Sequence, residues 1–290
     1  MGKPAKKPPT KAAPEPEKKP TVVLSCVNLK GGVGKTAVAV NFAAYCGIHG
    51  LRTLLVDLDP QTNATFSCVS VDVWEKHSTE KGTVANLLGV RQHTSAEGKE
   101  KTVEDVIISK VFKNVDLIPC HLDLVTIDLD LSSQVGRETR LRRALKDVLS
   151  HYDIVVCDCP PNLTIPTQNA LAVSTHYVVP VSPDFLSGIG VGLLLSRVAK
   201  LSDELENPLI HAGIVISRVG RASTFRAQTV QTLRDRFKDM VLSTEIVERN
   251  AVALSAARNI SVFDSGDQKA IDEFHNLGYE LLQKLGIAKK

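Results

Sequence analysis

Short apolar runs alternate with longer amphipathic stretches along most of this chain. Six runs of four to seven residues, rich in Val, Ile and Leu, end near Gly, Asp or Pro and read as strands. Most of them lack alternating polar positions, which is typical of strands covered on both faces. The pattern predicts an α/β fold with a mainly parallel, twisted sheet and helices on both faces. The predicted strands are 21–27, 53–56, 115–118, 153–157, 177–181 and 213–216, and the predicted helices are 36–48, 137–150, 190–207, 224–238 and 269–285.

The first 20 residues have a different composition. They hold six lysines, two glutamates and six prolines, so their net charge of +4 exceeds the +3 of the whole chain. Such a segment buries too little apolar surface to offset its ordering entropy. We therefore predict a disordered tail over 1–20 and a single folded domain over 21–290. The tail either solubilises the protein or contacts nucleic-acid phosphates.

Composition limits the location of the protein and the role of its cysteines. The 290 residues contain no run of about eighteen apolar positions, and the lysine-rich start lacks an apolar signal, so we expect a cytoplasmic protein without a membrane segment. The six cysteines lack paired metal-ligand spacing and read as reduced, buried thiols. Cys157 and Cys159 flank an aspartate on a predicted strand, so an iron–sulfur cluster bridging a dimer is the alternative.

A glycine-rich loop joins the first predicted strand to the first predicted helix. In this order, backbone N–H groups and the helix N-terminus converge on a bound phosphate. We expect Lys35 to contact the β- and γ-phosphates of ATP, and the Thr36 hydroxyl to bind Mg²⁺. Leu29 stands where the strict P-loop pattern has its first glycine, and a second lysine opens the loop instead. The predicted nucleotide-binding residues of the loop are Lys30, Gly31, Gly32, Val33, Gly34, Lys35 and Thr36.

The same loop also fits a dinucleotide-binding fingerprint. Residues 32–37 match G-x-G-x-x-A after a strand, and Asp57 closes the second predicted strand where a ribose-binding acid belongs. An NAD-dependent oxidoreductase is therefore a rival hypothesis. That fingerprint needs no Lys-Thr pair and does not predict Asp158 at the end of a later strand, so ATP fits the residues better.

Two later strands run into carboxylates. Asp57 and Asp59 follow the second predicted strand, and Asp158 follows the fourth. An open parallel sheet binds its ligand at the carboxyl ends of its strands. We predict that Asp59 orients the attacking water or holds the water shell of the metal, and that Asp158 acts on Mg²⁺ through water as a Walker B aspartate. The alternative role for Asp57 or Asp59 is a strand-end cap.

Together these elements resemble the ParA/MinD family of deviant Walker A ATPases over about residues 22–286. The segments 57–64, 116–119, 158–162 and 169–171 belong to the same pattern. Their order is more similar to the ParA/Soj partitioning branch than to MinD, because residues 285–290 form no amphipathic membrane helix.

The resemblance implies a homodimer that sandwiches two ATP molecules. In it, Lys30 of each subunit reaches the phosphates held by the other, and Lys30, Lys35 and Asp59 form the catalytic set. The closed dimer of that branch binds double-stranded DNA without sequence preference, at the nucleoid, until a ParB-like partner stimulates hydrolysis. Two alternatives stay open: the cargo is another large assembly, or the protein is a regulatory binding module that does not hydrolyse ATP.

The resemblance also assigns residues with weaker signals. Ala37 replaces a hydroxyl residue of many relatives and leaves only its backbone N–H for the α-phosphate, while Ser217 and Arg218 stand where relatives contact the base. The usual proline-containing segment is replaced by 244–250, so the adenine contacts stay open there. Aromatic residues make up only 4% of the chain, which favours duplex over single-stranded DNA. The predicted DNA-binding residues are Arg221, Arg226, Arg234, Arg249 and Arg258.

Overall fold

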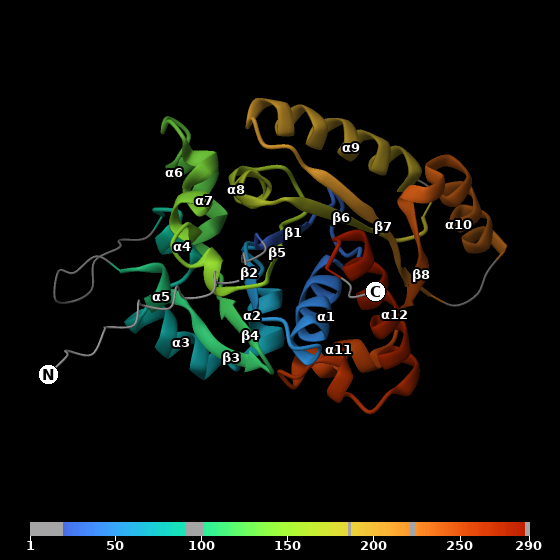
Figure 1. Ribbon diagram of the computed structural model, residues 1–290, viewed down its shortest axis with the longest axis horizontal. Coiled ribbons are helices and arrows are strands. Elements are labelled where there is room, and N and C mark those ends of the chain that lie inside the picture. The colour runs from blue at the N-terminus through green and yellow to red at the C-terminus, as the bar shows by residue number, and fades with distance from the viewer. Residues whose placement is uncertain (1–19, 91–100, 185–186, 221–223, 288–290) are drawn as a thin grey trace, which may run out of the picture.

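The computed structural model describes residues 20–90, 101–184, 187–220 and 224–287. The predicted tail up to residue 19 and Arg221 lie outside these residues. An eight-stranded sheet crosses the molecule in the order β3-β4-β2-β5-β1-β6-β7-β8, and only the β3–β4 pair is antiparallel (Figure 1). The strands are β1 (Val22–Cys26), β2 (Thr53–Asp57), β3 (Ile108–Phe112), β4 (Val115–Ile118), β5 (Ile154–Asp158), β6 (His176–Val181), β7 (Ile210–Val219) and β8 (Val241–Val247).

Helices cover both faces of this sheet, as predicted. One buried apolar cluster lies between the sheet and α1, α2 and α12, and the other lies under helices α4 to α10. Figure 1 shows these two layers on either side of the strands. The helices are α1 (Lys35–Ile48), α2 (Asn63–Cys68), α3 (Val71–Glu80), α4 (Val84–Leu87), α5 (Val103–Val106), α6 (Ile127–Asp130), α7 (Arg140–Leu145), α8 (Ile165–Val173), α9 (Ser187–Glu204), α10 (Thr224–Phe237), α11 (Asn250–Ala257) and α12 (Gln268–Lys284).

Every predicted strand is present, but two strands were not predicted. β3 and β8 form the two edges of the sheet, and each is only partly buried. Edge strands bury less apolar surface than central ones, so their sequences lack a continuous apolar run. In contrast, every residue of β2, β5 and β6 is buried.

The prediction of one helix over 137–150 is wrong. A 3-10 turn over Arg137–Thr139 precedes α7, which ends at Leu145, and a second 3-10 turn follows at Leu149–His151. In a continuous helix the N–H of Leu141 would donate to the carbonyl of Arg137. Here Asn169 of α8 takes both groups: its Oδ1 accepts from Leu141 N at 2.9 Å and its Nδ2 donates to Arg137 O at 2.8 Å.

The strand order brings three carboxyl ends together. β5 lies between β1 and β2, with Asp158 paired in register with Cys26 on one side and with Asp57 on the other. In a dinucleotide-binding fold, the strand that carries the ribose-binding acid neighbours the strand that precedes the glycine loop. Because β5 separates these two strands here, the sheet does not have the dinucleotide-binding order.

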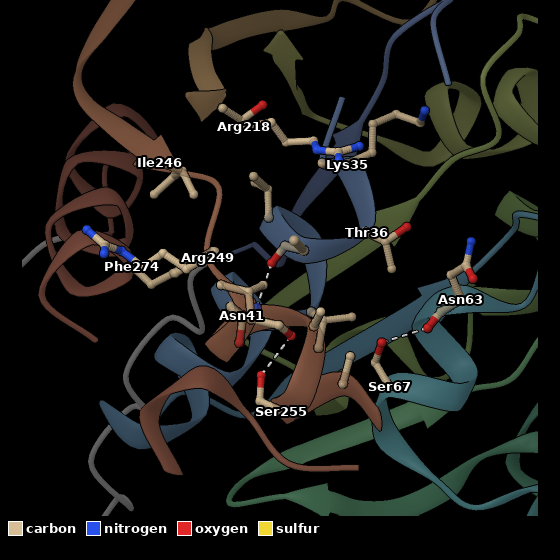
Figure 2. Close-up of a pocket in the computed structure, with 18 of the residues that line it drawn as sticks. Lys35, Thr36, Asn41, Asn63, Ser67, Arg218, Ile246, Arg249, Ser255 and Phe274 are labelled. Atoms are coloured by element: carbon tan, nitrogen blue, oxygen red, sulfur yellow. Dashed lines mark hydrogen bonds between the residues drawn. The ribbon is translucent and has the colours of Figure 1, made fainter. Parts of the chain in front are cut away.

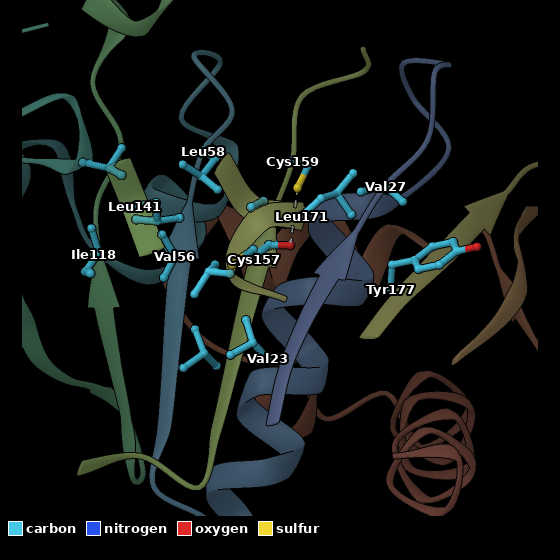
Figure 3. Close-up of a cluster of buried hydrophobic side chains, with 14 of the residues drawn as sticks. Val23, Val27, Val56, Leu58, Ile118, Leu141, Cys157, Cys159, Leu171 and Tyr177 are labelled. Atoms are coloured by element: carbon cyan, nitrogen blue, oxygen red, sulfur yellow. Dashed lines mark hydrogen bonds between the residues drawn. The ribbon is translucent and has the colours of Figure 1, made fainter. Parts of the chain in front are cut away.

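The six cysteines are all free and buried, which confirms the interpretation of them as packed thiols. Cys157 and Cys159 lie in the apolar cluster on the α8 face of the sheet, among Val27, Leu58 and Leu171 (Figure 3). Among the described residues, no three His, Cys, Asp or Glu side chains are grouped to hold a metal ion. None of the helices described is long and apolar enough to cross a membrane.

Candidate functional site

The glycine-rich loop leads directly from β1 into the N-terminus of α1. Gly32 and Gly34 have φ angles of 72° and 84°, a left-handed conformation that residues with a Cβ seldom adopt. Gly34 precedes α1 without a side-chain cap, so the N–H groups of the first helical turn keep their capacity to donate. A loop of this kind at a helix N-terminus binds anions.

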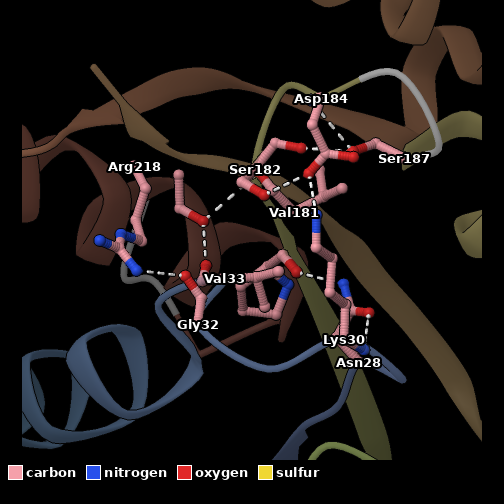
Figure 4. A network of polar contacts seen from close by, with 11 residues as sticks. Asn28, Lys30, Gly32, Val33, Val181, Ser182, Asp184, Ser187 and Arg218 are labelled. Carbon is pink, nitrogen blue, oxygen red and sulfur yellow. Dashed lines mark hydrogen bonds and ion pairs between the residues drawn. The ribbon is translucent and has the colours of Figure 1, made fainter.

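Two residues at the end of β7 hold the loop in place. The buried Ser217 donates its hydroxyl to Val33 O, and Arg218 donates from Nη1 to Gly32 O at 2.7 Å. Figure 4 shows Arg218 reaching Gly32 of the loop. Arg218 also forms an ion pair with Glu248. Both residues thus lie beside the loop and line the cavity next to it, and the contact with the base predicted for them stays a prediction.

Both lysines of the loop have internal partners. Lys35 is only 6% exposed, and its Nζ donates to Lys30 O at 3.2 Å across the loop. The ammonium of Lys30 pairs with Asp184 after β6. The ammonium of Lys35 is therefore already positioned within the loop that would bind a phosphate.

Asp158 is a buried carboxylate without a hydrogen-bond partner. It is fully buried at the end of β5, and neither carboxylate oxygen accepts a hydrogen bond within the described residues. Burial and the neighbouring Asp57 raise its pKa, and the hydroxyl of Thr36 opposes this shift. Buried polar groups are normally satisfied, so two free oxygens beside a threonine hydroxyl fit a hydrated divalent cation. Asp158 and Thr36 are thus the side chains that would hold Mg²⁺ here.

Asp57 fixes the segment that carries Asp59. One Asp57 oxygen accepts from Asp59 N at 3.1 Å, and the other accepts from Thr65 N at 2.8 Å and from Thr65 Oγ1 at 2.7 Å. Asp59 is 6% exposed, and its Oδ1 accepts from Gln61 N at 2.9 Å. Asp57 therefore acts as a cap at the strand end, and the role predicted for Asp59 in orienting water stays a prediction.

The pKa of Asp57 predicts how stability depends on pH. Burial raises this pKa to about 7, against the hydrogen bonds from Thr65 and Asp59. Because the native state then binds a proton that the unfolded chain releases, this contribution is full below about pH 4 and is lost as pH rises towards 7, at up to about 1.4 kcal/mol per unit. We expect the fall in stability with rising pH to be shallower in Asp57→Asn than in the wild type, in urea unfolding of nucleotide-free protein at pH 5 to 7. The same slope in that variant would contradict the assignment.

A cavity of about 600 Å³ opens beside the loop. It lies between α1, α2, the end of β8 and α11 (Figure 2). Apolar side chains of α11 and of its neighbours form much of the wall, and Asn41, Asn63 and Ser255 add polar groups. Its position and size suit the base and ribose of a nucleotide whose phosphates occupy the loop. The end of β8, within the segment 244–250 where the adenine contacts were left open, lines the cavity with Ile246 and Val247. Other lining residues were absent from the sequence prediction, among them Val252, Ala253, Ala256, Ala257, Ile260 and Phe274.

Filling this cavity should weaken nucleotide binding. Ala256 lines the cavity, so Ala256→Trp should occupy it. Overpacking costs about 1–3 kcal/mol, and a loss of this size in binding free energy corresponds to an affinity lower by about 5- to 140-fold. Leu254→Trp is the matched control, because Leu254 is 53% exposed on the same helix and does not line the cavity. Titration calorimetry with ATP would measure both, and equal affinities for the two variants would contradict the placement of the base.

The predicted DNA-binding arginines have different surroundings. Arg234 pairs with Glu245 at 2.8 Å and donates to Leu242 O at 3.0 Å, and Arg249 pairs with Glu273. Arg226 is partly exposed on α10, and Arg258 is exposed at the end of α11. The internal ion pairs leave Arg234 and Arg249 less available to phosphates. DNA contact by this set stays a prediction.

Comparisons with known proteins agree with this geometry. Residues 21–211 match the AAA domain family AAA_31. The sporulation initiation inhibitor protein Soj of Bacillus subtilis is 33% identical over 81% of this chain and 87% of its own. The cell division protein PomZ of Myxococcus xanthus is 34% identical over 85% of this chain and 73% of its own.

Solved structures share the fold. Cobyrinic acid a,c-diamide synthase from Mycobacterium smegmatis, with a bound ATP analogue and magnesium, superposes with a TM-score of 0.74 at 25% identity, covering 91% of this chain and 94% of that one. A putative plasmid partition protein from Borrelia burgdorferi superposes with a TM-score of 0.73 at 24% identity, covering 92% of this chain and 100% of that one. The family match and the sequence relatives, together with the loop and the strand order, show that the chain is a P-loop ATPase of the AAA_31 family, in the ParA/MinD group.

Proposed function

We propose that this protein is a DNA-partitioning ATPase in which Mg-ATP closes a sandwich dimer on duplex DNA. Hydrolysis, stimulated by a ParB-like partner, opens the dimer and releases the DNA. The observation that supports this most directly is the open loop at the N-terminus of α1, beside the unpartnered carboxylate of Asp158. A triphosphate and a divalent cation together complement these two features.

Each residue of the site then has a task. The backbone from Gly31 to Ala37 binds phosphates, Lys35 neutralises their charge, and Thr36 with Asp158 holds Mg²⁺. When bound, Mg²⁺ polarises phosphate oxygens and offsets the charge of the triphosphate. Asp59 orients the attacking water with the oxygen that Gln61 does not occupy.

A second cation from the partner subunit would complete the site. Lys30 is 56% exposed at the entrance of the loop, whereas Lys35 is buried within it. An exposed lysine at this position is able to reach phosphates held by a second copy. Such a cation supplied in trans stabilises charge that develops in the transition state, as an arginine finger does.

Relatives and surface arginines support DNA binding. Soj and a protein named as a plasmid partition protein are among the relatives and structural neighbours. The candidate contacts are arginines, which bind phosphates and give little base readout. We expect association with the nucleoid to depend on ATP, since only the closed dimer presents the arginines of two subunits together.

A different cargo is the second candidate. PomZ, a relative of similar identity, is named as a cell division protein. The ATP switch would be the same, and the assembly recognised by the partner would differ. Deleting the gene distinguishes the two functions: a partitioning ATPase should leave many cells without DNA, whereas a positioning ATPase should displace an assembly and leave DNA segregation normal.

Retention on DNA tests the switch itself. At fixed salt, the protein should bind duplex DNA of unrelated sequences equally with Mg-ATP and should lose most of this binding with ADP or without nucleotide. Raising the salt concentration should weaken the binding steeply, because phosphate contacts release counterions. Equal retention in all three nucleotide states would refute an ATP-controlled DNA switch, and Lys35→Ala is the control that should stay in the unbound state.

A further inference from the structure

The side chain of Lys30 is held by its own chain. Its Nζ forms an ion pair with Asp184, in the segment between β6 and α9, and the two side chains are 56% and 34% exposed. Figure 4 shows Lys30 extended from the loop towards Asp184. Neither residue lines the nucleotide cavity. The ion pair of Lys30 with Asp184 therefore lies outside the cavity, and contact with the base of a nucleotide does not explain it.

Asp184 is fixed as an acceptor before any ligand arrives. Its Oδ2 accepts from Ser182 Oγ at 2.8 Å, and its backbone N–H donates to Ser187 Oγ at 3.2 Å. The hydroxyl of Ser187 in turn donates to Ser182 O. Burial alone would raise the pKa of Asp184, but the donors Lys30, Ser182 and Ser187 bring the pKa below its ordinary value. The carboxylate is thus charged and oriented towards the lysine.

The backbone of Lys30 is fixed as well. Its N–H donates to Asn28 Oδ1 at 2.9 Å, and Asn28 Nδ2 donates to Pro180 O at 2.6 Å. Asn28 is only 8% exposed. The entrance of the loop is therefore attached to β6, the strand that leads into Asp184, and both ends of the ion pair start from the same rigid part of the sheet.

We propose that Asp184 is a positioning residue that holds Lys30 in the nucleotide-free chain and must release it before the ATP dimer closes. This inference rests on the proposed trans role of Lys30. One ammonium cannot pair closely with Asp184 and also lie against the partner's phosphates, so the two partners compete for it. An exposed ion pair changes an equilibrium constant by up to about fivefold, and a dimer opens two of them, so Asp184 opposes closure by up to about 25-fold.

Removing the charge of Asp184 should favour the dimer. With saturating Mg-ATP, Asp184→Asn should dimerise about 2- to 25-fold more tightly than the wild type by analytical ultracentrifugation, since two ion pairs no longer oppose closure. Asp184→Glu keeps a carboxylate and should dimerise as the wild type does. Glu204→Gln is the matched control, because it removes one carboxylate from another exposed pair, Lys200–Glu204, and should change nothing. Unchanged or weaker dimerisation of Asp184→Asn would overturn the proposal.

A measurement without nucleotide separates this inference from the proposed function. In carbon-detected NMR titrations, Lys30→Met should raise the pKa of Asp184. We call the Lys30–Asp184 ion pair the latch, and an unchanged pKa of Asp184 would overturn it whether or not ATP drives dimerisation. A dimer that forms in the wild type and is unchanged in Asp184→Asn overturns the latch alone. If neither protein dimerises with ATP, the proposed function fails and the latch fails with it. A dimer that forms only in Asp184→Asn supports the latch.

Discussion

Lys30→Ala should bind Mg-ATP almost as well as the wild type and yet lose stimulated hydrolysis by about 10³- to 10⁵-fold, the range measured for a cation supplied in trans. The physical reason is that the two lysines of the loop have different roles. Lys35 is buried and lies across the loop, whereas Lys30 is half exposed and turned away from the cavity. Its loss removes charge from the closed dimer and leaves the phosphate site of the monomer intact. Calorimetry and phosphate release would measure the two effects.

The control for this variant is Lys35→Ala, which should lose nucleotide binding itself. Light scattering adds the third measurement, because Lys30→Ala should remain monomeric with ATP. An ATP-dependent dimer of normal stability in Lys30→Ala would show that the lysine does not act across the interface. A hydrolysis rate within about tenfold of the wild type would contradict its role in neutralising the transition state.

The central half of the fold was predictable because its signals are local. β1, β2, β5 and β6 are buried on both faces and therefore appear as continuous apolar runs in the sequence. The glycine loop follows β1 directly, and the positive φ of Gly34 explains why a glycine precedes the helix. The carboxylates at the ends of β2 and β5 were found for the same reason, since each closes an apolar run.

The order of the strands in the sheet could not be predicted from such local signals. Nothing in the sequence near β1 or β2 reveals that β5, about a hundred residues later, lies between them. That insertion is what places Asp158 between Cys26 and Asp57 in register. It also removes the dinucleotide-binding alternative, which the local pattern alone had left open.

The contacts that tune the site were missed for a related reason. Lys30 and Asp184 are 154 positions apart, and Ser217 and Val33 are 184 apart. Pairs of this kind depend on which strand ends meet, not on the spacing of residues. The break of the helix predicted over 137–150 has the same origin, because Asn169 of another helix takes the backbone groups that would have continued it.

Asp59→Ala should trap the ATP dimer, with hydrolysis reduced by about 10²- to 10⁴-fold, the usual contribution of a positioned acid or base. Asp59 Oδ1 accepts from Gln61 N, and the other oxygen accepts no hydrogen bond within the described residues, so it is available to orient water. Asp59→Asn keeps the size of the side chain and a carbonyl oxygen for Gln61, and separates loss of charge from loss of the turn. Both variants should bind DNA with ATP and fail to release it when the partner is added. If Asp59→Asn hydrolyses ATP at the wild-type rate, the water is oriented elsewhere, because an amide whose oxygen stays on Gln61 N presents an NH2 donor to the water and cannot accept a hydrogen bond from it.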